Sequence, residues 1–326
     1  MNKVIIGVDM AKEKFDVVIL GATSKRKKQF PNTAQGRRRF TTEASRHEEV
    51  HVVMEATGTY HLPLAQQLEE ASIPYSIVNP LQIKRFAQMK LKRVKTDASD
   101  ALLIAQYGQE QKPPLHRMQP VVQQQLKQIN TVMEQLVKQR TALCNLAHAQ
   151  LYLPASLSMC EQVIKQSLKQ VERAIARLEA KQGELVEAAY GALQDLVLSV
   201  KGVGPRTTYA LLAYVGDFSG FQHNKQVSAY IGLNPVIVES GTMQTQSHIS
   251  KQGNPRLRTL FYLCALSAVR HNKDCKRLYV RLRSRGKKKK VALIAVANKL
   301  VRQVFAVVKS GVAFDNDYVE KRSIKT

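Results

Sequence analysis

The hydrophobic pattern changes its period once, at Lys112-Pro113-Pro114, and this change constrains the fold more than any other feature. Before it, short β-rich runs alternate with turns and one helical stretch. After it, apolar residues recur at alternating three- and four-residue steps, which is the spacing of helices that pack along a narrow seam. The sequence therefore predicts a compact α/β domain followed by a largely helical remainder, with the boundary at the Pro-Pro break.

Four β-rich runs predict strands in the first domain, at residues 4–8, 17–20, 51–54 and 76–78. Residues 61–71 carry apolar side chains at helical spacing between the last two runs, so a βαβ unit is expected there. A further helix is predicted over residues 97–109. These elements give an α/β domain over residues 1–112.

Two heptad runs follow, separated by Pro154, and they predict an antiparallel helical hairpin or coiled coil over residues 113–190. Their apolar positions are Leu126, Ile129, Met133, Leu136 and Leu143, then Ile164, Leu168, Val171, Ile175, Leu178 and Leu185. A stripe this narrow usually needs a partner helix, which indicates a homo-oligomer, a dimer or tetramer. A hairpin that only links two domains is the alternative. A mainly α-helical domain is expected over residues 191–314, with a flexible tail at 315–326.

The chain of 326 residues carries 50 Lys and Arg against 25 Asp and Glu, a net charge of +25. This excess indicates a polyanionic partner, and nucleic acid is the natural one. A membrane is not expected as the partner, because no apolar run approaches the ~20 residues of a spanning helix. Charged residues from Asp9 to Asp16 also argue against a signal peptide, so a cytoplasmic protein acting at the nucleoid is predicted. The four cysteines are far apart and form no C-x-x-C pair, which argues against a zinc site.

Four acidic residues form the candidate catalytic site. Asp9 and Glu55 each end an apolar strand, and Asp97 and Asp100 lie three residues apart on a predicted helix. Four carboxylates in one cleft would repel one another unless divalent cations neutralised them, and two Mg²⁺ ions can stabilise phosphoryl transfer. Alone, each residue has a simpler explanation: an Asp after a strand is often a turn residue, and Asp-x-x-Asp often faces solvent.

Four motifs in register resemble those of the insertion-sequence-110 family of transposases, to which the Piv-type DNA invertases also belong. They are Gly7-Val8-Asp9-Met10-Ala11-Lys12, Glu55-Ala56-Thr57-Gly58-Thr59-Tyr60, Val78-Asn79-Pro80 and Lys95-Thr96-Asp97-Ala98-Ser99-Asp100. The resemblance runs nearly end to end. It implies that the first domain is RuvC-like, with an RNase-H-like fold. It also implies that Asp9, Glu55, Asp97 and Asp100 are the acidic tetrad that binds the metal.

The stretch from Val200 to Thr207 resembles the hairpin of a helix-hairpin-helix motif. Backbone N–H groups in a Gly-x-Gly turn at a helix N-terminus can hold a phosphate, so Lys201, Gly202, Gly204 and Arg206 are candidate nucleic-acid contacts. An ordinary Gly-rich turn between helices is the alternative.

The resemblance also covers Gly232-Leu233-Asn234-Pro235 and Glu239-Ser240-Gly241, where it implies that Ser240 is the nucleophile. Composition alone gives no reason to single out Ser240, and Thr242 and Ser247 are nearby alternatives. Lys251, Arg256 and Arg258 lie in the next matching block and suit phosphate contacts. The basic run from Arg281 to Lys290 is either a nucleic-acid surface or a solvated loop.

Together these features predict a Mg²⁺-dependent DNA recombinase or transposase of a mobile element. The resemblance further implies a bridge RNA that pairs donor and target DNA, and an active site whose two halves meet between subunits. A Piv-type invertase and a non-catalytic nucleic-acid-binding protein on the same scaffold are the alternatives.

Overall fold

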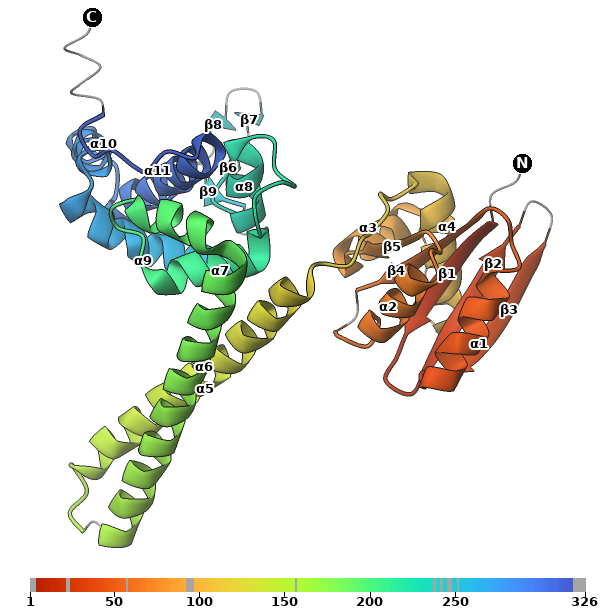
Figure 1. The fold of residues 1–326 in the computed structure, drawn as a ribbon, viewed down its shortest axis with the longest axis horizontal. Coiled ribbons are helices and arrows are strands. Elements are labelled where there is room, and N and C mark those ends of the chain that lie inside the picture. The colour runs from red at the N-terminus through yellow and green to blue at the C-terminus, as the bar shows by residue number, and fades with distance from the viewer. Residues whose placement is uncertain are drawn as a thin grey trace, which may run out of the picture. The chain divides into compact units, whose positions relative to one another are not determined.

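The computed structural model describes residues 4–21, 24–56, 58–91, 97–155, 157–236, 239–240, 243–244, 248–250 and 252–318. The chain divides into two compact units, Met1–Gln119 and Pro120–Thr326. The N-terminal unit runs from red to yellow in Figure 1, and the C-terminal unit runs from yellow to blue.

The N-terminal unit is built on a five-stranded mixed sheet with the order β3-β2-β1-β4-β5. Its strands are β1 (Val4–Met10), β2 (Lys14–Leu20), β3 (Lys25–Pro31), β4 (Val50–Glu55) and β5 (Tyr75–Val78). β1, β2 and β3 pair in antiparallel fashion, whereas β1, β4 and β5 are parallel. The four strands predicted from the sequence are confirmed, and so is the α/β class of this region.

Helices cover both faces of this sheet. They are α1 (Ala34–Ala44), α2 (Leu62–Glu70), α3 (Pro80–Met89) and α4 (Asp97–Gln111). α1 and α2 pack on the face that carries Phe15 and Val17, while α3 and α4 pack on the face that carries Ile5 and Val18. The β4-α2-β5 segment is the predicted βαβ unit, and α4 is the predicted helix extended by two residues.

The sequence pattern did not predict β3, α1 or α3. Residues 25–28 of β3 are all cationic, and a strand at the edge of a sheet needs little apolar surface. Its one partly buried side chain is Phe30, whose ring lies 5.5 Å from that of Phe15. The two helices start at local caps: Thr33 Oγ1 accepts a hydrogen bond from the backbone N–H of Gly36 (3.2 Å), and Asn79 caps α3 before its Pro80.

The predicted helical hairpin is present in the C-terminal unit as α5 (Val121–Gln150) and α6 (Ser158–Ser199) (Figure 1). Leu126 and Met133 are buried on α5, as is Ile175 on α6. The seam also contains a polar pair, because the amide of Gln182 donates to Asn130 Oδ1 (3.0 Å) with both side chains buried. A buried amide pair of this kind fixes the register of two helices.

The rest of the C-terminal unit is mainly helical, as predicted. Its elements are α7 (Pro205–Val215), α8 (Asn224–Ile231), β6 (Pro235–Val236), β7 (Glu239–Ser240), β8 (Met243–Gln244), β9 (His248–Ile249), α9 (Pro255–His271), α10 (Lys273–Ser284) and α11 (Lys289–Ser310). One apolar core joins α7, α9 and α11 to the end of α6. β6 pairs with β9, and β7 pairs with β8, in two small antiparallel ladders.

One expectation about apolar segments was wrong. Within the described residues, Lys289–Ser310 is long and apolar enough to cross a membrane by length and composition alone. Its apolar side chains have another explanation, because Leu293, Val296, Leu300 and Val304 are buried in the core of the C-terminal unit. The central helix of a protein core passes the same test, so α11 is weak evidence for a membrane span.

Candidate active site and nucleic-acid interface

The carboxyl ends of β1 and β4 bring two of the predicted acidic residues to one edge of the sheet. The two strands are parallel and pair Val8 with Met54, so Asp9 and Glu55 are the next residues on neighbouring strands. Neighbouring strands lie about 4.8 Å apart. Residues two apart point to the same side of a strand, which places both carboxylates on the side covered by α4. Both side chains are partly exposed.

α4 lies unusually close to β1 because Gly7 has no side chain. A Cβ at Gly7 would overlap the backbone of Ala101 in the second turn of α4. Farther along the helix, Gly108 makes a similar close approach, and a Cβ there would lie 2.9 Å from Ile5 Cγ2. α4 therefore runs antiparallel to β1, with its N-terminus at the carboxyl end of the strand.

This direction brings the other two predicted ligands toward the same edge. Asp97 is the first residue of α4, and Asp100 directly precedes the residue that packs on Gly7. Asp100 is partly exposed, and its carboxylate accepts a hydrogen bond from Ser99 Oγ (3.4 Å). The side chain of Asp97 lies outside the described part of the structure. The N-terminus of a helix also carries a partial positive charge, which favours anionic ligands.

Carboxylate oxygens are the ligands that Mg²⁺ prefers, so the residue types of this edge fit that ion. Among the side chains that the structure describes, however, no group of three or more His, Cys, Asp or Glu residues could hold a metal ion. The fourth predicted ligand, Asp97, is not among those side chains. The backbone thus places Asp9 beside Glu55 and directs the start of α4 toward them, but Asp9, Glu55 and Asp100 do not form a set of metal ligands by themselves.

The predicted phosphate-binding turn connects α6 to α7. Gly202 has φ +103°, and a Cβ there would lie 2.7 Å from Cβ of Ala268 on α9, so the turn packs tightly against that helix. Gly204 is the N-cap of α7, and the space around it is open. Lys201 and Arg206 are exposed on either side. The turn borders a pocket of about 460 Å³, which leaves room for a phosphate at the start of the helix.

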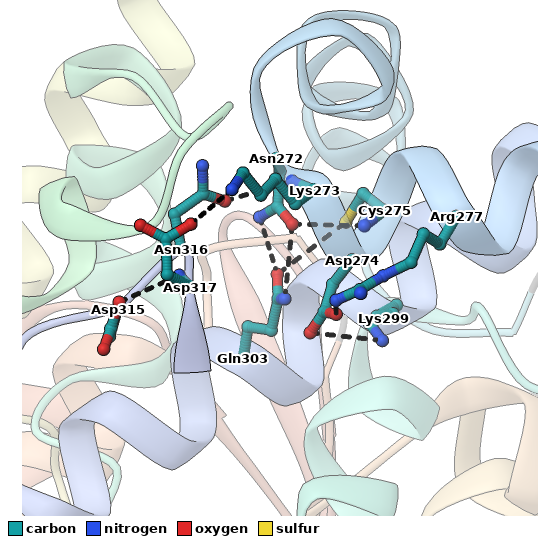
Figure 2. A network of polar contacts seen from close by, with 10 residues as sticks. All are labelled: Asn272, Lys273, Asp274, Cys275, Arg277, Lys299, Gln303, Asp315, Asn316 and Asp317. Atoms are coloured by element: carbon teal, nitrogen blue, oxygen red, sulfur yellow. Dashed lines mark hydrogen bonds and ion pairs between the residues drawn. The ribbon is translucent and has the colours of Figure 1, made fainter. Parts of the chain in front are cut away.

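Asn272, which the sequence analysis did not single out, holds this turn in place. Its side chain is fully buried, and Nδ2 donates to the carbonyl oxygen of Lys201 (3.2 Å) and to Gln303 Oε1 (3.0 Å). Oδ1 accepts from the backbone N–H of Cys275 (3.1 Å) and so caps α10. Figure 2 shows Asn272 between Gln303 and Cys275. One side chain therefore ties the turn to α10 and α11. An Asn just before a helix is a cap signal that the sequence did contain.

Several cations near Asn272 are paired with acidic side chains (Figure 2). Lys273 Nζ lies 2.6 Å from Asp317, and Arg277 lies 2.7 Å from Asp274, which also lies 3.5 Å from Lys299. Asn316 Oδ1 accepts from the backbone N–H of Lys273 (3.0 Å). The start of the predicted flexible tail is thus bound to α10, and these cations are partly neutralised.

The block from Lys251 to Arg258 corrects one predicted phosphate contact. The Arg256 side chain is only 9% exposed, and its Nη1 lies 2.7 Å from Glu134 and donates to the carbonyl of Asn130 (2.6 Å) on α5. Its guanidinium therefore holds α9 against the hairpin. Arg258 Nη1 donates to the carbonyl of Ile231 (3.2 Å) and is partly exposed. Lys251 lies outside the described residues.

Ser240 lies on β7, where it pairs with Met243 of β8. Its side chain, together with Thr242 and Ser247, lies outside the described part of the structure. The flanking ladder is anchored, because Ile249 of β9 pairs with Pro235, and the backbone N–H of Ser250 donates to the carbonyl of Asn234 (3.2 Å). The predicted nucleophile therefore belongs to a small β extension between α8 and α9.

The basic run from Arg281 to Lys290 lies at the junction of α10 and α11. Its cationic side chains are exposed: Arg281, Arg283, Arg285, Lys287, Lys288, Lys289 and Lys290. A groove of about 880 Å³ runs beside it, with apolar walls that include Leu278 and Ile294 and with Lys290 and Arg302 on its rim. Ile249 of β9 also lines the groove, so it adjoins the Ser240 extension.

Comparison with known proteins shows a relative that matches almost the whole chain. The Pilin gene-inverting protein of Moraxella bovis is 32% identical over 97% of this chain and 98% of its own length. Two family models also match, one described as "Transposase" over residues 6–153 and one as "Transposase IS116/IS110/IS902 family" over residues 194–280. The chain belongs to the insertion-sequence-110 family.

The insertion-sequence-110 family comprises transposases and DNA invertases, so a DNA partner follows from membership. The transposase of insertion sequence element IS1111A from Coxiella burnetii is 28% identical over 93% of this chain and 89% of its own length. The first family model includes all four acidic positions, and the second includes the Lys201 turn and Ser240. A T. thermophilus RuvC bound to a Holliday junction substrate is similar over 35% of this chain and 99% of its own, at 14% identity and a TM-score of 0.28.

Proposed function

We propose that this member of the insertion-sequence-110 family is a Mg²⁺-dependent transposase that cuts and rejoins DNA at the edge formed by β1, β4 and α4. The observation that supports the proposal is the register of β1 and β4 together with the close packing of α4 on Gly7. Asp9 and Glu55 end neighbouring parallel strands, and Gly7 lets the first turn of α4 approach them with Asp97 and Asp100. The strand order and this acidic edge support a RuvC-like, RNase-H-like assignment for the N-terminal unit.

The four carboxylates would hold two Mg²⁺ ions. When bound, these ions would neutralise the negative charge on the phosphate during phosphoryl transfer. Asp9 and Glu55 are fixed by the sheet, so they would set the position of the site. Asp97 and Asp100 belong to a helix and would complete it from the other side. Carboxylates kept partly exposed, as Asp9, Glu55 and Asp100 are, remain accessible to both metal and DNA.

Ser240 would act as the nucleophile. Its Oγ would give up its proton and form a bond to phosphorus while the bond from phosphorus to the leaving deoxyribose oxygen breaks, and that oxygen would take up the proton that the serine releases. The phosphoserine linkage conserves the energy of the broken phosphodiester, so a second DNA end can reverse the step without a nucleotide cofactor. The matching residue of the family motif and the position of Ser240 on a β extension beside basic surface support this role.

The DNA backbone would be held by the turn between α6 and α7 and by the next block. Lys201, Gly202, Gly204 and Arg206 surround an open helix N-terminus, and Lys251 and Arg258 would add further contacts. These groups carry no base specificity. Selection of the target by a bridge RNA, through base pairing, is compatible with a protein of net charge +25 and few aromatic residues.

A homo-oligomer, a dimer or tetramer, would assemble through the hairpin. Large apolar side chains are exposed near its tip: Leu151 (76%), Tyr152 (75%), Leu157 (71%) and Met159 (70%). Exposed apolar clusters are typical of protein interaction sites. The Ser240 half and the carboxylate half of the site would then meet within one subunit or between two. The cytoplasm, at the nucleoid, is the proposed location, without a membrane partner.

Trapping tests the mechanism directly. Purified protein with its copurifying RNA is incubated with cognate DNA and Mg²⁺, denatured and digested, and the peptides are searched for a nucleotide linked to Ser240. Ser240→Ala should abolish both the adduct and strand exchange, whereas Ser219→Ala, in an exposed turn, should leave both intact. Normal exchange by Ser240→Ala would show that another group, such as a metal-activated water, attacks the phosphorus.

A Piv-type invertase is the second candidate, and the near full-length similarity to the Moraxella bovis inverting protein favours it. Plasmids that carry two cognate sites distinguish the two activities. An invertase flips the intervening segment, while a transposase excises it or moves it to a target. A non-catalytic nucleic-acid-binding protein would instead keep its cellular activity after Asp9→Asn.

A further inference from the structure

The edge strand β3 carries four consecutive cations, Lys25-Arg26-Lys27-Lys28, all of them exposed. Side chains alternate between the two faces of a strand, so this run is divided into two pairs. Lys28 belongs to the α1 side, where its Nζ lies 2.7 Å from Glu43. Arg26 shares that side. Lys25 and Lys27 therefore point to the opposite side, which is the face covered by α3 and α4.

The register of the sheet links Lys27 to the catalytic edge. Lys27 pairs with Val18 on β2, and Val18 pairs with Gly7 on β1. In the next row, Asp9 pairs with Asp16, and Asp16 accepts a hydrogen bond from Gln29 Nε2 (2.9 Å). Asp9 and this lysine pair thus share one face of one continuous sheet, and no hinge separates them.

We propose that the β3 rim, defined as Lys25 and Lys27, binds the backbone of the duplex DNA that leads to the carboxylate edge. This inference rests on the proposed function for the identity of that edge. Its new content is a DNA-holding surface on the N-terminal unit itself, separate from the turn and basic block of the C-terminal unit.

The dimensions of the sheet suit a duplex backbone. Lys27 lies two strands across and two residues along from Asp9, which corresponds to about 12 Å between Cα atoms. Lys25 lies one further step of about 7 Å away along the strand. Duplex DNA has one phosphate per 3.4 Å of axis on each strand, so the two lysines can follow one backbone over about two base pairs while a phosphate lies at the edge.

The charge distribution on β3 favours DNA binding over a role that only protects the edge strand from pairing with other chains. Lysines on an edge strand can also prevent pairing with other chains, a role that either face would serve equally. The two faces differ in the number of unpaired cations: on the α1 side Glu43 neutralises Lys28 and leaves only Arg26, whereas within the described residues no ion pair involves either Lys25 or Lys27 on the opposite side. The unneutralised pair is the one that shares a face with Asp9. An unneutralised cation beside the path of a polyanion gains affinity by releasing counterions.

The experiment measures how duplex affinity depends on salt. The full-length protein is titrated, without Mg²⁺ to prevent cutting, against a 40-base-pair duplex DNA over a range of salt concentrations. Lys25→Gln with Lys27→Gln should lower the slope of log K against log[salt] by about 1.8, which is about 0.9 for each lost phosphate contact. Arg26→Gln with Arg39→Gln removes the same charge from the α1 side and is the matched control, expected to change the slope by less than half as much.

Equal losses in the two double variants would overturn the proposal, because only general electrostatic attraction would be at work. No loss in either would overturn it as well. A loss seen with a duplex RNA of the same length but not with DNA would assign the rim to RNA and reject the DNA assignment. Thermal unfolding checks that both variants are folded, and Lys25→Ala with Lys27→Ala provides a second pair if the glutamines disturb the strand.

The experiments distinguish an error in the proposed role of the β3 rim from an error in the proposed function. If wild-type protein does not exchange strands of cognate DNA, the proposed function is wrong, yet the difference in slope can still be measured. If strand exchange depends on Asp9 but the lysine variants bind like wild type, only the rim is wrong.

Discussion

The carboxylate edge and the Lys201 turn hold their functional groups in different ways. At the edge, Asp9 and Glu55 are placed by the backbone register of two paired strands, and α4 is placed by contact with Gly7. At the turn, the conformation depends on the Asn272 side chain, which reaches from the junction of α9 and α10 to the carbonyl of Lys201. A ladder spreads its stabilisation over many hydrogen bonds, whereas the turn relies on a few.

Because of this difference, substitutions at the edge and at the turn should affect different properties of the protein. Damage at the edge should remove chemistry while leaving the fold and DNA affinity largely intact. Damage at the turn should reduce stability and DNA affinity together while leaving the carboxylates in place. The predictions that follow test this contrast, beginning with the largest expected effect.

Removal of divalent metal should abolish DNA cutting and rejoining by at least about 10³-fold, because the carboxylates would then repel one another and the phosphate. Binding of duplex DNA should change little. Cleavage of cognate DNA with and without EDTA is compared with binding under the same conditions. Full cleavage in EDTA would contradict the metal role of the edge, and recovery on adding Mg²⁺ is the control.

Gly7→Val should reduce strand exchange by about 10²-fold, because the new side chain pushes α4 and its two Asp residues away from Asp9. Overpacking should also lower the free energy of unfolding by about 1–3 kcal/mol. Gly220→Ala is the control, since nothing lies within 4 Å of the added carbon. Unchanged activity in Gly7→Val would mean that the position of α4 does not matter for chemistry.

Asn272→Ala should lower the free energy of unfolding of the C-terminal unit by about 2 kcal/mol, because the α10 cap is lost and the carbonyl of Lys201 loses its donor. Chemical denaturation measures this loss, and titration with duplex DNA should show a parallel loss of affinity. A stability loss with unchanged DNA affinity would show that the turn does not bind DNA. Asn316→Ala, at the exposed margin of the same network, is the control.

Two glycines of the turn should respond differently to alanine. Gly202→Ala should lower the free energy of unfolding by about 1–2 kcal/mol, since φ is +103° and Ala268 lies in the way. Gly204→Ala should stay within about 0.5 kcal/mol, because the space there is open. Thermal unfolding of the pair measures the difference. Equal effects would mean that the turn is not packed against α9.

At neutral pH the cysteines give the smallest effect. Cys144 and Cys160 are exposed and should react with a thiol reagent in the folded protein, while buried Cys264 and Cys275 should react only on unfolding. Burial raises the pKa of the Cys275 thiol from 9.0 to about 12. Below pH 9 this has no effect on stability. Between pH 9 and 12 the free energy of unfolding should fall, because the unfolded thiol ionises and the buried one does not. Denaturation as a function of pH, with Cys275→Ala as reference, checks this sign.

The sequence predicted the parts of the fold that have strong apolar patterns. Strands such as Val50–Glu55 are buried on both faces, and the hairpin follows a heptad spacing, so each was visible from its own residues. β3 was missed because an edge strand can be almost entirely cationic, and α1 because its start is marked only by the Thr33 cap.

The same distinction applies to the candidate site: features set by the local pattern could be predicted, and features set by distant contacts could not. The convergence of Asp9 and Glu55 could be predicted, since the ends of parallel strands share an edge. The roles of Arg256 and Asn272 could not, because each depends on a partner far away in sequence, Glu134 for the one and Lys201 for the other. A basic residue in a basic protein gives no sign of whether an internal carbonyl or a phosphate will be its acceptor.

α6 is a single element of 42 residues that begins at the tip of the hairpin and ends just before the Lys201 turn. At 1.5 Å per residue it acts as a lever about 60 Å long. Its backbone departs from helical geometry at Tyr190, nine residues before its end, and bending should concentrate there. If a neighbouring subunit bound the tip, as proposed, a bend at Tyr190 would change the direction of the hairpin relative to the Lys201 turn.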